Sequence, residues 1–253
     1  MVNMAEHNAH ISALIELHRG LERQGPGDPS FSRHILSLLP ELPQNPRIVD
    51  LGCGAGAGAL ILAKWFKTRV TAVDFARPFL DDLENHATAQ GLAHLIKTVE
   101  ADMGNLNWPP ASVDLLWSEG AAYNLTFEGA LNNWRPLMTP AGIAVISEVS
   151  WFTDEIPVPV MTFWQEAYPQ IASETENSKI AYAAGFEVLG TYRLPAQAWW
   201  TYYYDPLKKR METLRPSADP VMQDVIAETE FEIEFFEKYS DTYGYAFYVL
   251  QAV

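Results

Sequence analysis

The sequence has little of what would tie it to a disulfide framework, a membrane or a nucleic acid. Its 253 residues include one cysteine, Cys53, which excludes intrachain disulfides and leaves the redox compartment open. No run of about 18 apolar residues occurs, so we expect no membrane-spanning helix. Only 17 bases stand against 32 acids, a net charge of -15. So few cations would bind phosphates weakly, and we expect neither a nucleic-acid nor a membrane partner.

What the sequence does contain is typical of a folded globular domain. Hydrophobic residues make up 48% and aromatic residues 12% of the chain, enough to bury a substantial core. The first twenty residues include Glu6 and Glu16 and lack the basic-then-apolar pattern of a signal peptide, so a cytoplasmic location is expected. We predict a single domain over residues 1–253, and a homodimer stays open.

One stretch, residues 48–56 (IVDLGCGAG), organises the rest of the chain. A short apolar strand stops in a glycine-rich turn, and the Ala- and Leu-rich residues 57–66 predict a helix after it. This arrangement places backbone N–H groups at a helix N-terminus, beside the carboxyl edge of a sheet. Glycines there let a ligand approach the main chain closely. The turn is therefore a candidate cofactor site.

Two cofactor classes fit this turn. Gly54, Gly56 and Ala59 match the dinucleotide fingerprint, with Asp74 about 20 residues further on where a ribose-binding acid belongs. The competing pattern places Asp50 on the strand before Gly52, Gly54 and Gly56. An acid beside the loop suits a ligand with an ammonium and a sulfonium and repels a pyrophosphate. Charge therefore favours a cationic methyl donor over NAD.

Strand and helix patterns alternate after residue 47, which predicts an α/β fold with a mainly parallel sheet. Beyond the first unit, expected strands cover 69–74, 96–101, 113–117, 143–149, 186–192 and 245–253, and expected helices cover 78–90, 127–138 and two segments within 160–184. Residues 140–142 are expected to form the turn before the strand at 143–149.

The sheet is flanked by an N-terminal cover and a late insertion. Helices are expected over 9–23 and from Pro29, with Asp28 as N-cap and an apolar face that extends to Leu42. This cover spans residues 1–44, and the core sheet spans 45–194. The aromatic-rich residues 195–243 are expected to be a mostly helical insertion before the last strand, 244–253.

The sequence resembles the class I S-adenosylmethionine-dependent methyltransferases, in particular the ubiquinone/menaquinone-biosynthesis-like small-molecule group. The resemblance rests on "VDLGCGAGA", "AVDF", "EADM" and "LTPAGIAVISE", and "RQGPG" and "WSEGAAYN" match bacterial methyltransferases of unassigned substrate. It implies a Rossmann-like seven-stranded sheet whose last two strands form an antiparallel hairpin. The implied cofactor is S-adenosylmethionine, with S-adenosylhomocysteine as product, and the implied partner is a small-molecule acceptor.

The same resemblance implies a set of donor-binding residues. Asp74 would bind the ribose hydroxyls and Phe75 would contact the adenine, while Asp102 would bind the adenine amino group and Met103 would pack on the ring. The full set expected at the cofactor is Gln24, Gly25, Asp50, Gly52, Cys53, Gly54, Gly56, Asp74, Phe75, Asp102, Met103, Ser118 and Glu119. We assign no metal site.

Residues just past the fourth strand are candidates for catalysis. Glu119 would pair with the donor's ammonium, orient a cationic substrate or act as a base, unless it only caps the next turn. Tyr123 is a second catalytic and substrate-binding candidate, and Asn124 a substrate-binding one; both also fit a packing role. Ser118-Glu119-Gly120-Ala121 replaces the Asn/Asp-Pro-Pro-aromatic motif common in nucleobase amino methyltransferases, which argues against a nucleic-acid substrate.

The remaining substrate candidates come from the cover and the insertion. His18 lies on the apolar stripe of the first helix, where a half-buried, hydrogen-bonded histidine is also expected. Trp200 and Tyr204 belong to the run WWTYYY, which we expect either to wall the acceptor or to attach the insertion to the sheet. The alternatives to a methyltransferase are an NAD(P)-dependent oxidoreductase and an inactive S-adenosylmethionine-binding protein.

Overall fold

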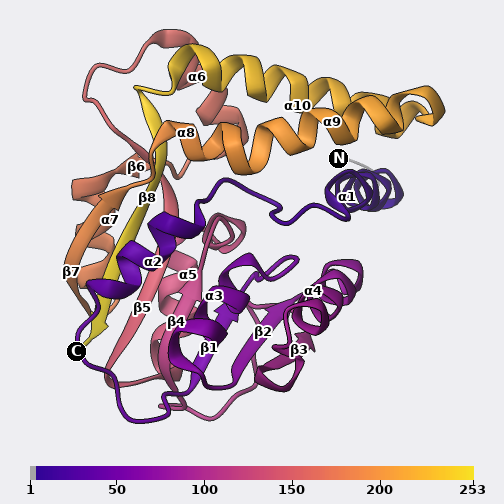
Figure 1. Cartoon of the computed structure of the whole chain (residues 1–253). Coiled ribbons are helices and arrows are strands. Elements are labelled where there is room, and N and C mark those ends of the chain that lie inside the picture. The colour runs from indigo at the N-terminus through magenta and orange to yellow at the C-terminus, as the bar shows by residue number, and fades with distance from the viewer. Residues whose placement is uncertain (1–3) are drawn as a thin grey trace.

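A central β-sheet with helices on both faces dominates the structure (Figure 1). The computed structural model describes residues 4–253, with side chains from Glu6 onward. Seven strands follow the order β3-β2-β1-β4-β5-β8-β7, and the short β6 pairs with β5. Strands β1 to β5 pair in parallel, whereas β8 is antiparallel to both β5 and β7. This confirms the predicted Rossmann-like methyltransferase sheet.

The strands are β1 (Ile48–Leu51), β2 (Val70–Asp74), β3 (Ile96–Glu100), β4 (Val113–Ser118), β5 (Met138–Trp151), β6 (Ala172–Ser173), β7 (Phe186–Arg193) and β8 (Tyr243–Ala252). The α-helices are α1 (Met4–His18), α2 (Pro29–Ser37), α3 (Ala57–Phe66), α4 (Arg77–Ala89), α5 (Phe127–Trp134), α6 (Val158–Ala167), α7 (Glu174–Ala183), α8 (Ala196–Trp199), α9 (Asp205–Leu214) and α10 (Pro220–Tyr239). A π-helical segment, η4 (Trp200–Tyr204), joins α8 to α9.

Four expected boundaries are wrong, each for a local reason. The helix expected over 127–138 ends at Trp134, because a short 3₁₀ turn that contains Pro136 follows it. Helix α1 ends at His18 and not at residue 23, because Gly20 takes a left-handed backbone with φ +78°. Helix α2 opens at Pro29 with Asp28 accepting two backbone N–H groups, as predicted, but it ends at Ser37, so Leu42 lies beyond it. Strand β5 begins at Met138, and the expected turn at 140–142 is an irregularity in its pairing with β4.

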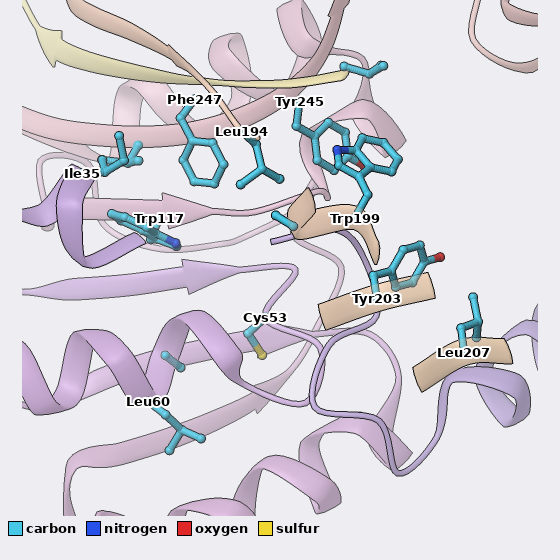
Figure 2. Packing of buried hydrophobic residues seen from close by; sticks show 14 of the residues in the cluster. Ile35, Cys53, Leu60, Trp117, Leu194, Trp199, Tyr203, Leu207, Tyr245 and Phe247 are labelled. Atoms are coloured by element: carbon cyan, nitrogen blue, oxygen red, sulfur yellow. The ribbon is translucent and has the colours of Figure 1, made fainter. Parts of the chain in front are cut away.

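The core lies in two layers, one on each face of the sheet. The larger layer joins the inner sides of α2 and α3 to the insertion helices, and Figure 2 shows Trp117, Trp199, Tyr203 and Tyr245 among its side chains. The smaller layer packs α5 and α7 against the opposite face. Helix α1 lies beside α9 and α10, so the N-terminal cover and the insertion contact each other at one end of the molecule (Figure 1).

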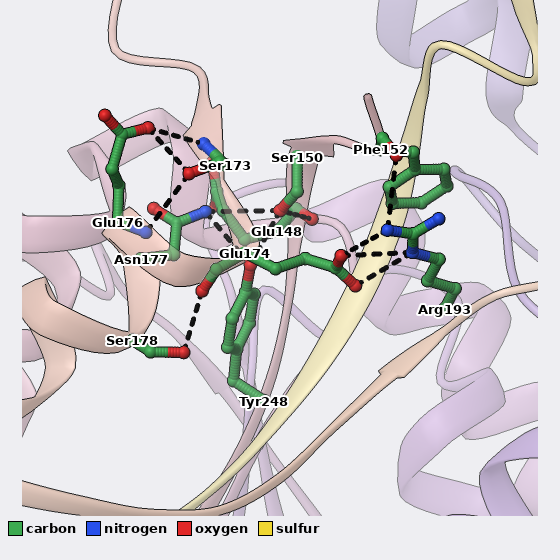
Figure 3. Close-up of polar contacts among 10 residues, drawn as sticks. All are labelled: Glu148, Ser150, Phe152, Ser173, Glu174, Glu176, Asn177, Ser178, Arg193 and Tyr248. Carbon is green, nitrogen blue, oxygen red and sulfur yellow. Dashed lines mark hydrogen bonds and ion pairs between the residues drawn. The ribbon is translucent and has the colours of Figure 1, made fainter. Parts of the chain in front are cut away.

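A buried polar network fastens α7 to the antiparallel part of the sheet (Figure 3). The Asn177 amide donates to Ser150 Oγ at 3.2 Å and to Tyr248 Oη at 3.1 Å, and those two hydroxyls lie 2.8 Å apart. Asn177, Ser150 and Tyr248 therefore each have hydrogen-bond partners, which offsets the free-energy cost of burying these three side chains. No helix within residues 4–253 is long and apolar enough to cross a membrane.

Candidate functional site

A cavity of about 760 Å³ lies at the carboxyl edge of the parallel strands, under α1 and the loop that follows it. Residues from the ends of β1, β2 and β4 and from the loop after β3 form its floor, because parallel strands bring their carboxyl ends to one edge. The residues expected from the sequence that line it are His18, Gln24, Gly25, Asp50, Gly52, Cys53, Gly54, Asp74, Phe75, Asp102, Met103, Glu119, Tyr123 and Asn124.

Two residues expected at the cofactor lie outside this cavity. Gly56 is the N-cap of α3 and faces α4, since a Cβ placed on it would lie 2.1 Å from Leu83 Cδ1. Ser118 is fully buried and donates its hydroxyl to the Leu51 carbonyl at 2.9 Å. Both residues support the loop and the strand ends, which corrects their expected placement against the cofactor.

The two aromatic residues expected to wall the acceptor are also outside the cavity. Tyr204 is fully buried, and its hydroxyl donates to Glu232 at 2.8 Å. Trp200 packs against Tyr204 and Phe236, with the Lys208 ammonium 4.9 Å from its ring centroid. These contacts attach the insertion to the core and correct the expectation that Trp200 and Tyr204 face a substrate.

The backbone N–H groups of the glycine-rich loop after β1 already have hydrogen-bond partners within the protein. The N–H groups of Gly52 and Cys53 both donate to the Val73 carbonyl, and that of Gly56 donates to the Cys53 carbonyl. The Gly54 N–H donates to Asp74 Oδ2 at 2.8 Å. The Ala55 N–H donates to Gln24 Oε1 at 2.6 Å. No amide from Gly52 to Gly56 is therefore left to bind a phosphate group.

The electrostatics of the cavity depend most on Asp50. It is buried at the end of β1 and lines the cavity, and its Oδ2 has no hydrogen-bond partner in the part of the chain that the structure describes. Burial, followed by repulsion from Glu119 and Asp74, raises the pKa of Asp50 well above its usual range. The Ala59 backbone N–H and the charge of Arg23 offset this in part, but a buried carboxylate oxygen without a partner is costly unless a cation pairs with it. The site thus calls for a positively charged ligand group at Asp50.

The side chains expected around a nucleoside surround the other end of the cavity. Asp74 accepts from the backbone N–H groups of Gly54 and Ala76, so its carboxylate is held in place, while burial raises its pKa. Phe75 is 62% exposed although its ring is large and apolar. Asp102 is exposed beside Met103, and both line the cavity. An exposed aromatic ring next to fixed carboxylates suits a flat ligand that carries hydroxyl and amino groups.

Glu119 is held by three donors. Arg23 Nη1 lies 2.6 Å from Oε2, and the Ser32 hydroxyl and the Trp117 indole N–H each donate to Oε1 at 2.8 Å. The Arg23 and Glu119 side chains are only 6% and 8% exposed, so this is a buried ion pair. We therefore interpret Glu119 as the anchor that fastens the N-terminal segment to the sheet, and its expected roles toward the donor's ammonium, a cationic substrate or a proton stay predictions.

Sequence analysis missed one wall of the cavity. Ile11, Leu14 and Ile15 line it from α1, and Tyr203 lines it from η4. The helical spacing of the α1 residues was visible, but the same spacing is typical of a core face. Tyr203 contacts the histidine on the same wall, with its hydroxyl 3.1 Å from His18 Nε2. On the other side of the cavity, Tyr123 is 41% exposed and Asn124 donates its amide to the Ala121 carbonyl.

Residues 48–142 match the model of a protein family described as "Methyltransferase domain". The chain is 24% identical over 204 residues to trans-aconitate 2-methyltransferase from Azoarcus sp. (strain BH72). The matched segment covers 79% of this chain and 71% of that protein. Further curated methyltransferases are matched over between 24% and 35% of their length.

Solved structures show the same fold. The E. coli protein YjhP superposes with a TM-score of 0.81 at 18% identity, over 95% of this chain and 99% of that one. A methyltransferase from Thiobacillus denitrificans, crystallised with S-adenosylhomocysteine, superposes with a TM-score of 0.77 at 19% identity over the whole of both chains. Residues 48–142 thus match a methyltransferase domain, and the chain as a whole has the fold of S-adenosylmethionine-dependent methyltransferases.

We predict that Gly54→Ala abolishes ligand binding in the cavity. Gly54 has φ +52°, and an added Cβ would lie 2.2 Å from Gln24 Oε1, so the variant is strained and pushes Gln24 off the loop. Gly91→Ala is the matched control, because Gly91 also has a positive φ (+70°) but lies outside the cavity, and a Cβ there meets nothing within 4 Å. Calorimetry with S-adenosylhomocysteine measures both. Equal affinity in the two variants would contradict the tight contact between Gln24 and the loop.

We also predict that Glu119→Gln is strongly destabilised. Removing one charge of a buried pair leaves Arg23 uncompensated, which costs about 3–5 kcal/mol in free energy of unfolding. The exposed carboxylate of Glu128 provides the control, and Glu128→Gln should change stability by less than about 0.5 kcal/mol. Urea unfolding of both variants measures the difference. A Glu119→Gln variant as stable as the wild type would restore the hypothesis of a catalytic base.

Proposed function

We propose that this chain binds S-adenosylmethionine in the 760 Å³ cavity and transfers its methyl group to a small-molecule acceptor. The observation that carries the proposal is the buried, unpartnered Asp50 Oδ2 beside a loop whose amides are already hydrogen-bonded. The donor's methionine end carries an ammonium, which would supply the missing counter-charge. Its sulfonium adds a second positive charge in the same region.

The carboxylate of the donor has a candidate partner as well. Arg23 lines the cavity, and its Nη2 is buried without a hydrogen-bond partner in residues 4–253, although Nη1 is paired with Glu119. Asp50 and Arg23 thus offer one unsatisfied acceptor and one unsatisfied donor near each other. This pairing of opposite charges suits the zwitterionic end of an amino acid.

The nucleoside of the donor would occupy the other end. We assign Asp74 to the ribose hydroxyls, Phe75 and Met103 to the faces of the adenine, and Asp102 to the adenine amino group, since all four line the cavity. When bound, S-adenosylmethionine would supply an electrophilic methyl group, whose carbon a nucleophile attacks in line with the departing sulfur. The protein's part is then to hold the acceptor against that methyl and to exclude water.

The dinucleotide alternative finds less support in this geometry. A pyrophosphate at this position needs free amides at the start of the helix after β1. The loop amides are satisfied, and Asp50 Oδ2 would lie 2.9 Å from a Cβ at Gly58, in the first turn of α3. A buried carboxylate there repels phosphate.

The methyl acceptor is proposed to be a small molecule. The formal net charge of -15 disfavours nucleic acid, and the cavity accommodates a donor with a compact acceptor beside it. The similar protein from Azoarcus is a trans-aconitate 2-methyltransferase, which also acts on a small molecule.

Calorimetry with S-adenosylhomocysteine and with NAD tests the donor. We expect the homocysteine compound to bind and NAD not to bind. Asp74→Ala should weaken that binding by about 1–3 kcal/mol, the scale for charge-assisted hydrogen bonds to a ribose. Asp81→Ala, an exposed carboxylate paired with Arg77 on α4, is the control and should leave affinity unchanged.

Two results would contradict the proposal. Tight NAD binding without S-adenosylhomocysteine binding would identify an oxidoreductase. Wild-type affinity in Asp74→Ala would show that the ribose lies elsewhere. Methyl transfer to any compound in a broad metabolite screen would exclude the third possibility, a donor-binding protein without activity.

A further inference from the structure

The wall of the cavity formed by α1 and η4 is apolar apart from one hydrogen-bonded pair. Ile11, Leu14 and Ile15 line it from α1, and His18 and Tyr203 complete it. These residues are distinct from those we assign to the donor. Figure 2 shows the segment of Tyr203 above the loop that carries Cys53, and both residues line the same cavity. A molecule between the donor and this wall would meet Tyr203.

The hydrogen bonds of His18 fix where its proton lies. Nδ1 is 2.8 Å from the Leu14 carbonyl, and a carbonyl only accepts, so Nδ1 carries the hydrogen. Burial lowers the pKa of His18, which favours the neutral ring. In that neutral ring Nε2 has a lone pair and accepts from the Tyr203 hydroxyl at 3.1 Å. Tyr203, whose hydroxyl proton is then directed to His18, lines the cavity and keeps the lone pairs of Oη.

The backbone conformation of the insertion gives Tyr203 different surroundings from those of the next residue, Tyr204. Residues Trp200–Tyr204 form a π-helical turn between α8 and α9, a rare conformation that is frequent at functional sites. Within it Tyr203 lines the cavity, whereas Tyr204 is fully buried in the core. Two independent features therefore point to Tyr203: its conformation, and a histidine oriented to accept its proton.

Resting on the proposed methyl transfer, we propose that Tyr203 and His18 accept the proton of an uncharged phenol-type acceptor. The acceptor oxygen forms a bond to the methyl carbon as the carbon–sulfur bond breaks, and sulfur keeps that electron pair. The phenolic proton passes to Tyr203 Oη, and the proton of Tyr203 passes to His18 Nε2. The resulting imidazolium still donates Nδ1–H to Leu14. Tyr203 is the catalytic residue, and His18 positions it and takes the proton.

The charged side chains of the cavity and the acidity of the acceptor's hydroxyl group together select the substrate class. The charged side chains that line the cavity are four carboxylates and Arg23, and the charge of Arg23 is paired with Glu119. A polycarboxylate would therefore be repelled. A phenol has a pKa of about 10, whereas burial raises the pKa of Tyr203 well above its usual range, so Tyr203 holds its own proton until it receives that of the acceptor. An aliphatic alcohol is a far weaker acid and would hold its proton.

The test uses the full chain loaded with S-adenosylhomocysteine for binding and with methyl-labelled S-adenosylmethionine for transfer. The probes are catechol and 2-naphthol, their fully methylated ethers, and trans-aconitate. We expect the phenols to bind and be methylated, and the ethers and trans-aconitate to give no product. Tyr203→Phe should lower kcat about 100-fold, the usual scale for a proton acceptor. His18→Gln, which keeps a hydrogen-bond acceptor but no base, should lower kcat in the same direction.

Tyr202→Phe is the matched control, because Tyr202 lies in the same π-helical turn and lines a different cavity. It should keep wild-type kcat, and all three variants should keep wild-type affinity for S-adenosylhomocysteine. Absence of phenol binding, methylation of trans-aconitate in place of the phenols, or wild-type kcat in Tyr203→Phe would each overturn the inference while the donor assignment stands. Absence of S-adenosylhomocysteine binding to the wild type would overturn the proposed function and this inference with it.

Discussion

The buried ion pair between Arg23 and Glu119 is the interaction on which the site depends. It joins the loop after α1 to the turn after β4, and Ser32 and Trp117 complete the contacts of Glu119. Through it the N-terminal cover is held over the carboxyl edge of the sheet, which gives the cavity its roof. Arg23 Nη1 is paired with Glu119, and Asp50 Oδ2 has no hydrogen-bond partner among the described residues, although the charge of Arg23 and the Ala59 backbone N–H offset part of the cost of burying Asp50. Glu119 thus fastens the N-terminal cover, and we assign Asp50 to the ligand.

Much of the donor half of the site could be predicted because its determinants are local. Asp50, Gly54 and Asp74 follow directly on buried strands, and a parallel sheet brings such positions to one edge. Glycines in a tight loop predict positive φ angles, because glycine adopts them without strain, and Gly52 and Gly54 both have a positive φ. The parallel pairing of the first strands likewise follows from the alternation of strands and helices, whereas the antiparallel β8 was implied by the resemblance to the methyltransferases.

The acceptor half could not be predicted because its determinants are not local. The run Trp200–Tyr204 gives no sign of which ring faces the cavity, and helical spacing groups Trp200 with Tyr204. The π-helical turn changes that phase, so Tyr203 lines the cavity and Tyr204 enters the core. The anchor role of Glu119 depends on Arg23, 96 positions earlier in the chain, and on how the cover folds back. Tertiary packing decides both.

The central claim is that Asp50 awaits the ammonium of an S-adenosyl donor, and affinity for S-adenosylhomocysteine as a function of pH tests it most directly. Burial raises the pKa of Asp50, so the carboxyl is protonated and neutral on the acidic side of that pKa and charged above it. The account predicts that wild-type affinity strengthens as the pH rises through the pKa of Asp50, while Asp50→Asn binds weakly with no such rise. Wild-type affinity in Asp50→Asn, with the same pH dependence, would contradict it.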